Sequence, residues 1–173
     1  MLPDPLHPAI VHFPVVLAFL LPISAFVAIW TIRKGTRATR AWMVPLAIAA
    51  GLSLSSWVSV ETGEGQGERV ERVVQEQPLD AHEEAAEAFL TGSVVVLLIA
   101  AAGLIKGPVG TIGRIGATVG SLALVAGAAY VGHTGGQLVY RYGAASAYAT
   151  PGTQGGGLAA AGETRARGAD SDD

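Results

Sequence analysis

The sequence predicts an all-α integral membrane protein: a four-helix bundle with up-down topology, both termini outside and a disordered C-terminal tail. Half of the 173 residues are apolar and only 14% are charged, which is too apolar for a water-soluble domain whose surface must be covered in charge. Four stretches carry no Asp, Glu, Lys or Arg, namely residues 11–32, 41–60, 88–105 and 115–140. A membrane-spanning helix needs roughly 17–25 apolar residues, so each stretch can cross a bilayer.

The charges between these stretches predict the orientation. The connections after the first and third stretches hold no acid, and their basic residues are Arg33, Lys34, Arg37, Arg40, Lys106 and Arg114. The connection after the second stretch holds nine acids against Arg69 and Arg72. Because Lys and Arg next to membrane spans stay in the cytoplasm, we expect the acidic connection and both termini outside. No basic segment precedes the first span and no cleavage pattern follows it, so we expect that span to stay as an anchor.

The first two helices are expected at about residues 8–32 and 41–60. Pro8 suits the first turn of the first helix, since its missing N–H would have no partner there. Pro14 and Pro22 lie farther inside, where each removes a backbone hydrogen bond and favours a kink. The second helix carries small residues at four-residue steps, which favour close helix contact: Gly51, Ser55 and Ser59.

The third and fourth helices are expected at about residues 81–105 and 112–140. Asp80 is the expected N-cap of the third helix, with Glu83 as its capping-box partner. Residues 61–79 before it are expected to form an outer acidic loop, flexible at ETGEGQGE and with a short surface helix that stops at Pro78. The fourth helix carries a stripe of small residues for close packing: Gly113, Gly116, Gly120, Ala123 and Gly127.

These helices form a single transmembrane domain over residues 1–143. Residues 144–173 are rich in Gly and Ala and end in acids, so we expect them to be disordered. There is no cysteine, which excludes disulfides, thiolate metal sites, iron–sulfur clusters and covalently attached c-type haem. The zinc-hydrolase pattern H-E-x-x-H is also absent, because no histidine follows His82 at the required spacing. We assign no catalytic residue and leave an enzymatic role open.

All four histidines fall at the predicted outer ends of helices. His7 and His12 lie at the start of the first helix, His82 at the start of the third and His133 near the end of the fourth. Ionisable side chains at membrane depth usually face the bundle interior, where they pair, carry protons or bind a ligand. The four imidazoles are therefore a candidate binding site. The plain alternative, in which they only bond water, lipid headgroups or freed carbonyls, stays open.

Depth in the apolar sequence ranks these histidines. A five-residue step turns a helix by about 140°, so His7 and His12 cannot both point inward unless a proline distorts the turn. We expect His12, which lies deeper, to point inward with His133 as its partner and His82 as the substitute.

Three residues beyond His133 complete this candidate site. Gly135 and Gly136 would leave room for a large flat ligand beside the imidazole. Gln137 lies one helical turn beyond His133 and could orient the ring or bond the ligand. These side chains could equally be part of an aromatic and polar belt at the membrane surface.

Three motifs, HPAIVHFPVVL, LDAHEE and GHTGGQLVYRYG, resemble an uncharacterised bacterial family of four-helix membrane proteins, domain of unknown function 2231. The likeness runs from about Leu6 to Gly143 and implies a multi-pass protein of the bacterial inner (plasma) membrane, N-out and C-out. Some relatives look joined to cytochrome-like domains, which implies redox work. The positions that match the family motifs are His7, His12, His82, His133, Gly135 and Gly136. Where many relatives have histidine this chain has Tyr142, which we therefore leave out of the site.

The leading hypothesis is a non-covalent b-type haem held by His12 and His133 for single-electron transfer. The alternative is a site for zinc or copper, two ions that suit imidazole and carboxylate ligands; its candidate ligands are His7, His12, His82 and His133 with Asp80, Glu84 or Glu87. A third hypothesis is a non-catalytic subunit that packs on a larger membrane complex through the stripe of small residues. The expected partners are the lipid bilayer, a redox partner or that larger complex, and a second copy of the chain, but no nucleic acid.

Overall fold

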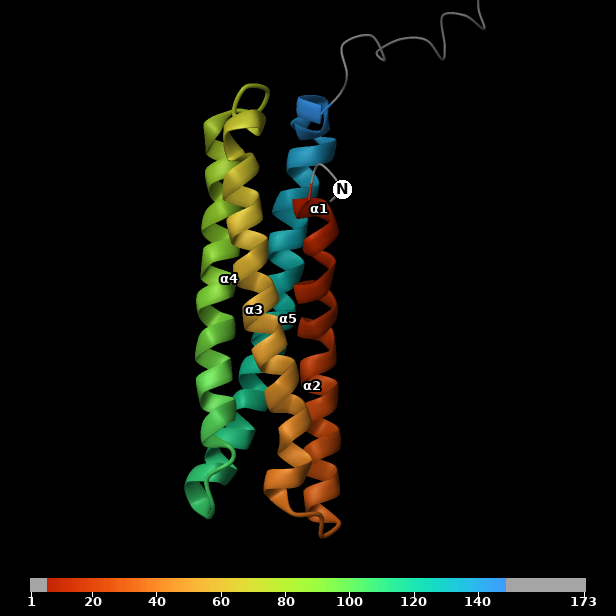
Figure 1. Ribbon diagram of the computed structural model, residues 1–173, viewed down its shortest axis with the longest axis vertical. Helices are drawn as coiled ribbons and strands as arrows, with labels where there is room; N and C mark the ends of the chain where they lie inside the picture. Colours follow the sequence, from red (N-terminus) through yellow and green to blue (C-terminus); the bar gives the residue numbers. More distant parts are fainter. Residues whose placement is uncertain (1–5, 149–173) are drawn as a thin grey trace, which may run out of the picture.

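The computed structural model describes residues 6–148, and in this part of the chain it contains helices and no strands (Figure 1). The elements are α1 (His7–Ile10), α2 (His12–Arg33), α3 (Ala38–Val70), α4 (Glu76–Ala102), α5 (Pro108–Tyr140) and a short 3-10 helix, η1 (Ala144–Tyr148). Four helical stretches are long and apolar enough to cross a membrane, the first of them α1 with α2. The predicted all-α fold with four membrane spans is confirmed.

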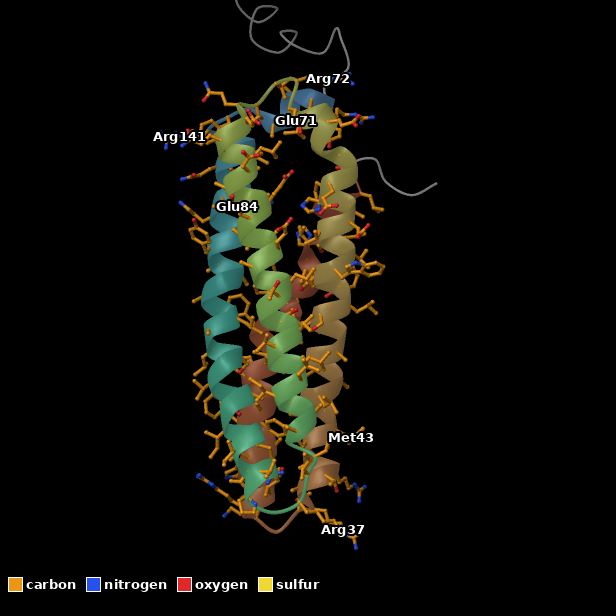
Figure 2. The ribbon with its side chains drawn as sticks, turned by 90° about the vertical axis from the view of Figure 1, so that its left-hand side faces the viewer. Arg37, Met43, Glu71, Arg72, Glu84 and Arg141 are labelled. Carbon is orange, nitrogen blue, oxygen red and sulfur yellow. The ribbon has the colours of Figure 1, made fainter. Side chains whose placement is uncertain are left out.

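The helices form one bundle in which α2 packs against α3 and α5, and α4 packs against the same two helices. Hence α2 and α4 occupy one diagonal of the bundle. One end, called here the basic end, carries the connections 34–37 and 103–107; the other, the acidic end, carries the connection 71–75 and η1. Figure 2 shows Arg37 and Met43 at the basic end, and Glu71, Arg72 and Arg141 at the acidic end.

The outer surface of the bundle is apolar along its middle. Large exposed side chains lie on every long helix, among them Phe13, Phe19, Phe26, Trp30, Leu54, Trp57, Leu98, Ile112 and Val119. A water-soluble monomer rarely exposes contiguous apolar area on this scale. The bundle is therefore surrounded by lipid, with its few buried polar side chains turned inward.

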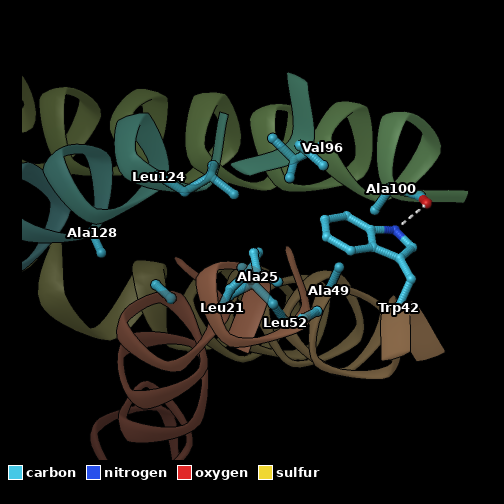
Figure 3. Packing of buried hydrophobic residues seen from close by; sticks show 12 residues of the cluster. Leu21, Ala25, Trp42, Ala49, Leu52, Val96, Ala100, Leu124 and Ala128 are labelled. Atoms are coloured by element: carbon cyan, nitrogen blue, oxygen red, sulfur yellow. Dashed lines mark hydrogen bonds between the residues drawn. The ribbon is translucent and has the colours of Figure 1, made fainter. Parts of the chain in front are cut away.

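The interior is packed with small residues and one large ring. Trp42 of α3 is fully buried near the basic end, and its Nε1–H donates a hydrogen bond of 2.8 Å to the Ala100 carbonyl of α4 (Figure 3). Most of the other buried residues of the core are alanines or leucines, among them Ala18, Leu21, Ala25, Ala49, Leu52 and Leu124. Small side chains let the helix backbones come close, which favours association in lipid.

The stripe of small residues on α5 is used inside the bundle, against α4. A methyl group added at Gly120 would lie 2.8 Å from the Val96 side chain, and one added at Gly127 would lie 3.2 Å from Phe89. Ala123, which the sequence pattern placed on this stripe, is exposed instead. The stripe is therefore occupied by α4, and it does not offer the free docking face expected for a larger complex.

The outer acidic loop predicted at residues 61–79 is mostly helix. α3 runs on to Val70 and α4 already begins at Glu76, so residues 71–75 alone connect them. Asp80 consequently lies inside α4, and Gln75 occupies the N-cap position without a side-chain hydrogen bond. Glycine in a helix costs about 1 kcal/mol relative to alanine, but Gly67 is buried, facing Glu83 of α4. Packing between the two extensions outweighs that cost.

The first membrane span is interrupted one turn before Pro14. Proline has no N–H to donate to the carbonyl four residues back, which here is that of Ile10, and the helix breaks at Val11 between α1 and α2. Pro22 stays inside a continuous α2.

The acidic end is closed by an apolar cluster of Val74, Leu79, Leu138 and Ala144, called here the end cluster. Residues 144–148 of the predicted disordered tail form η1, which packs on α3 and α5. The Tyr148 hydroxyl donates a hydrogen bond of 2.8 Å to Gln66 of α3. Residues 149–173, the rest of that predicted tail, lie outside the described residues.

Candidate histidine site

Two imidazoles meet inside the acidic end of the bundle. His7 begins α1 and His82 lies in the second turn of α4, so they come from opposite corners of the bundle. Their ring centroids are 6.4 Å apart, and the ring planes are nearly perpendicular, at 83°. Both side chains are half-buried. Of the four histidines, these two are the ones that the fold brings together.

A backbone carbonyl of α3 fixes the tautomer of His7. Its Nδ1 lies 2.8 Å from the Ser59 carbonyl oxygen and 3.4 Å from Thr62 Oγ1. A carbonyl oxygen can only accept a hydrogen bond, so Nδ1 carries the proton. In the neutral ring, Nε2 is then left with a lone pair that can bind a metal centre.

A threonine hydroxyl of α5 does the same for His82. Its Nδ1 lies 2.9 Å from Thr134 Oγ1, which donates its own proton to the Val131 carbonyl at 3.0 Å. The hydroxyl must therefore accept from the imidazole, and Nδ1 again carries the proton. Both rings are held in the form used by most metal-ligating histidines, which donate one ring N–H to the protein.

Two glycines make room for these rings. A methyl group at Gly63 would lie 3.2 Å from His7 Cε1, and one at Gly135 would lie 3.0 Å from His82 Cε1. Gly135 thus contacts an imidazole, but of His82 rather than the predicted His133. A methyl group at Gly136 would meet open space.

The two histidines favoured by sequence depth point elsewhere. His12 is exposed at the start of α2, so the prediction that it points inward in place of His7 is wrong. His133 is exposed on α5, where the predicted contact with Gln137 is present: the amide N–H donates a hydrogen bond of 3.0 Å to His133 Nε2. Neither ring belongs to the inward pair.

A heptad signal could have identified His7. The buried face of α2 comprises Pro14, Ala18, Leu21, Ala25 and Ala28, at steps of three and four residues. His7 lies one heptad before Pro14, on the extension of this face, whereas His12 lies two residues before it and turns away.

The carboxylates offered as metal ligands do not join the pair. Asp80, Glu84 and Glu87 are exposed on α4. Within residues 6–148, no three His, Asp or Glu side chains gather closely enough to hold a metal ion. The two imidazoles are the donor set that the described chain provides.

Comparison with known proteins agrees with this fold. The model of the family described as predicted membrane protein (DUF2231) matches residues 3–147. The chain belongs to this family. The matched DUF2231 region contains all five α-helices and both imidazoles of the inward pair. No curated protein and no solved structure is similar enough to match.

Proposed function

We propose that this membrane bundle binds one non-covalent b-type haem at its acidic end for single-electron transfer, and that His7 and His82 are the residues that would hold it. The observation that carries the proposal is the pair itself. Two imidazoles from opposite corners of the bundle lie with their ring centroids 6.4 Å apart, and each uses Nδ1–H to bond the protein. Each ring thereby keeps Nε2 for a ligand.

The number of donors favours haem over a bare ion. A haem macrocycle brings four nitrogen donors and takes its axial ligands from the protein, whereas zinc takes three or four protein ligands. His7 and His82 supply two, and a third His, Asp or Glu does not join them among the described residues. The ring centroids lie 6.4 Å apart, so the two imidazoles are close enough that both would hold one metal centre.

The residues around the pair would orient and tune the ligands. When bound, the haem supplies the one-electron chemistry. The Ser59 carbonyl and the Thr134 hydroxyl hold the two rings in one orientation and raise the basicity of Nε2. Because a more basic imidazole is a stronger donor, both bonds would lower the reduction potential of a haem held by these residues. The end cluster lies at the same end of the bundle and would limit access of water from that side.

The acidic end also defines where electrons would enter and leave. We place it on the periplasmic side of the inner membrane, because the opposite end carries the basic residues that stay in the cytoplasm. A redox partner would then meet the protein from the periplasm or from within the bilayer.

The absorbance spectrum of the detergent-purified protein tests the proposal. We expect a sharp Soret band and split visible bands on reduction, lost in His7→Ala and in His82→Ala. His12→Ala and His133→Ala are the matched controls and should keep the spectrum, since both rings are exposed. A colourless protein that carries stoichiometric zinc or copper would instead support the metal-binding alternative. Loss of the bands in His12→Ala would contradict the assignment of ligands.

A further inference from the structure

The two halves of the chain repeat one histidine-holding unit. In each half, a threonine is followed by glycine, and its hydroxyl donates to the carbonyl three residues earlier. These bonds are Thr62 to Ser59 at 3.1 Å and Thr134 to Val131 at 3.0 Å. Thr62 also has a shorter bond of 2.8 Å to the Val58 carbonyl, which has no counterpart at Thr134 in the described chain. The unit in the first half is His7 with Ser59, Thr62 and Gly63; the unit in the second half is His82 with Val131, Thr134 and Gly135. The pair therefore lies between two equivalent hairpins, α1–α3 and α4–α5.

The two units differ in which atom holds the ring. His7 Nδ1 lies 2.8 Å from a carbonyl oxygen, and the Thr62 hydroxyl is more distant at 3.4 Å. Hydrogen bonds from N–H to oxygen are strongest at about 2.9–3.0 Å or less and weaken beyond about 3.2 Å. His82 Nδ1 instead lies 2.9 Å from the Thr134 hydroxyl, which is its close partner, with the Val131 backbone carbonyl as a further acceptor beside the ring. Removing each threonine hydroxyl should therefore have unequal effects.

We propose that Thr134 is the positioning residue of the histidine pair: it sets the tautomer and direction of His82, while Thr62 only assists a ring already held by backbone. The effect on a bound haem rests on the proposed function. The effect on the imidazole does not, because it concerns the protein alone.

The first test reads the tautomer without any cofactor. In protein labelled with ¹⁵N-histidine and held in detergent micelles, NMR distinguishes Nδ1–H from Nε2–H. We expect His82 to carry Nδ1–H in the wild type and to lose that preference in Thr134→Val, which removes the hydroxyl but keeps the side-chain shape. Thr134→Ser should restore the preference. If Thr134→Val leaves the His82 signals unchanged, or the wild-type ring carries Nε2–H, the inference is wrong.

The second test titrates haem into the same variants. Loss of a partner that orients a metal ligand typically weakens binding by about 10–100-fold, which we expect for Thr134→Val together with a higher midpoint potential. Thr62→Val should lose less affinity than Thr134→Val. Thr91→Val, on the exposed surface of α4, is the unchanged control. Equal losses in Thr62→Val and Thr134→Val would overturn the inference. Absence of haem binding in the wild type would refute the proposed function. The NMR result would then decide whether Thr134 positions His82.

Discussion

The glycines beside the two rings make room for them because glycine has no Cβ atom. A methyl group at Gly135 would lie 3.0 Å from His82 Cε1, and one at Gly63 would lie 3.2 Å from His7 Cε1. Both distances are shorter than an ordinary van der Waals contact of about 3.5–4.0 Å between carbon atoms. An added methyl group must therefore move the ring or the helix.

We predict that Gly135→Ala displaces His82 and lowers the free energy of unfolding by about 1–3 kcal/mol, as overpacking does. The control is Gly136→Ala on the same turn, where the methyl group meets open space; it should be neutral or stabilise by up to about 1 kcal/mol, because alanine favours helix. Thermal unfolding of the two variants in one detergent makes the comparison. Equal melting temperatures would show that the ring does not lie against Gly135.

Sequence reasoning found the histidines but not the atoms that hold them. It placed all four at the correct end of the bundle, since helix starts and ends can be read from the apolar stretches. It chose His12 over His7 because depth in the apolar sequence was weighed above the helix face. Ser59 and Thr62 were missed as partners of His7, because a contact across 52 or 55 residues depends on how two helices are aligned. The dipeptide Thr-Gly, at 62–63 and 134–135, was the available signal, although it also occurs at 91–92 without a histidine partner.

At the scale of the helices, α4 and α5 depend on small residues that face each other's side chains. Gly120 lies opposite Val96, with no room for a side chain between them. Ala123, one turn farther along α5, is exposed. A substitution at Gly120 therefore tests packing inside the bundle, whereas one at Ala123 tests contact with lipid.

We predict that Gly120→Leu separates α4 from α5 and lowers the melting temperature in detergent, because a leucine side chain cannot fit where one methyl group would lie 2.8 Å from Val96. Ala123→Leu should leave the melting temperature unchanged, since its side chain enters lipid or detergent. A larger effect of Ala123→Leu would indicate a second interface on the outer face of α5.

Trp42 joins α3 to α4 at the basic end. Its ring is fully buried and its N–H bonds the Ala100 carbonyl. We predict that Trp42→Ala lowers the free energy of unfolding by about 3–5 kcal/mol, the usual cost of truncating a buried aromatic residue. Trp42→Phe keeps a ring but removes the indole N–H, while the Ala100 carbonyl still accepts from the Gly103 N–H, so it should cost about 0.5–1.5 kcal/mol. Trp57→Ala is the control, because that indole is exposed on the same helix; a comparable loss in Trp57→Ala would contradict the buried role of Trp42.

The extensions of α3 and α4 show where local sequence signals fail. Glycines, acids and Pro78 between residues 61 and 79 favour a loop when each is considered alone. In the fold, Gly63 and Gly67 are the close-contact positions of a helix, and Pro78 lies in a first turn that needs no N–H from it. These residues are explained by neighbours on α1 and α4, which a local pattern does not include.

At the scale of the whole molecule, the membrane makes the fold predictable. Every backbone polar group in lipid must be bonded within the chain, so four apolar stretches allow little besides four helices. α3 has 33 residues, or about 50 Å at 1.5 Å per residue, against a hydrocarbon core of about 30 Å. The helices therefore continue beyond the hydrocarbon core into the water layer. Hydropathy alone could not show where these polar helix ends stop.

The orientation of this molecule can be tested with a single thiol, because the chain has no native cysteine. We predict that Ser146→Cys in η1 reacts with a membrane-impermeant maleimide in intact cells, whereas Thr36→Cys at the basic end reacts only after permeabilisation. Both native side chains are exposed, so access differs by side of the membrane and not by burial. The reverse pattern would place the histidine pair at the cytoplasmic face.

The boundary at Val11 divides the first membrane span into a short helix, α1, and the long helix α2. α1 is four residues long, and the His7 imidazole is its side-chain bond to α3. A molecule that bonds both imidazoles would also join α1 to α4, because His7 belongs to α1 and His82 to α4. Capture or release of such a molecule would therefore change how firmly α1 is held against the rest of the bundle.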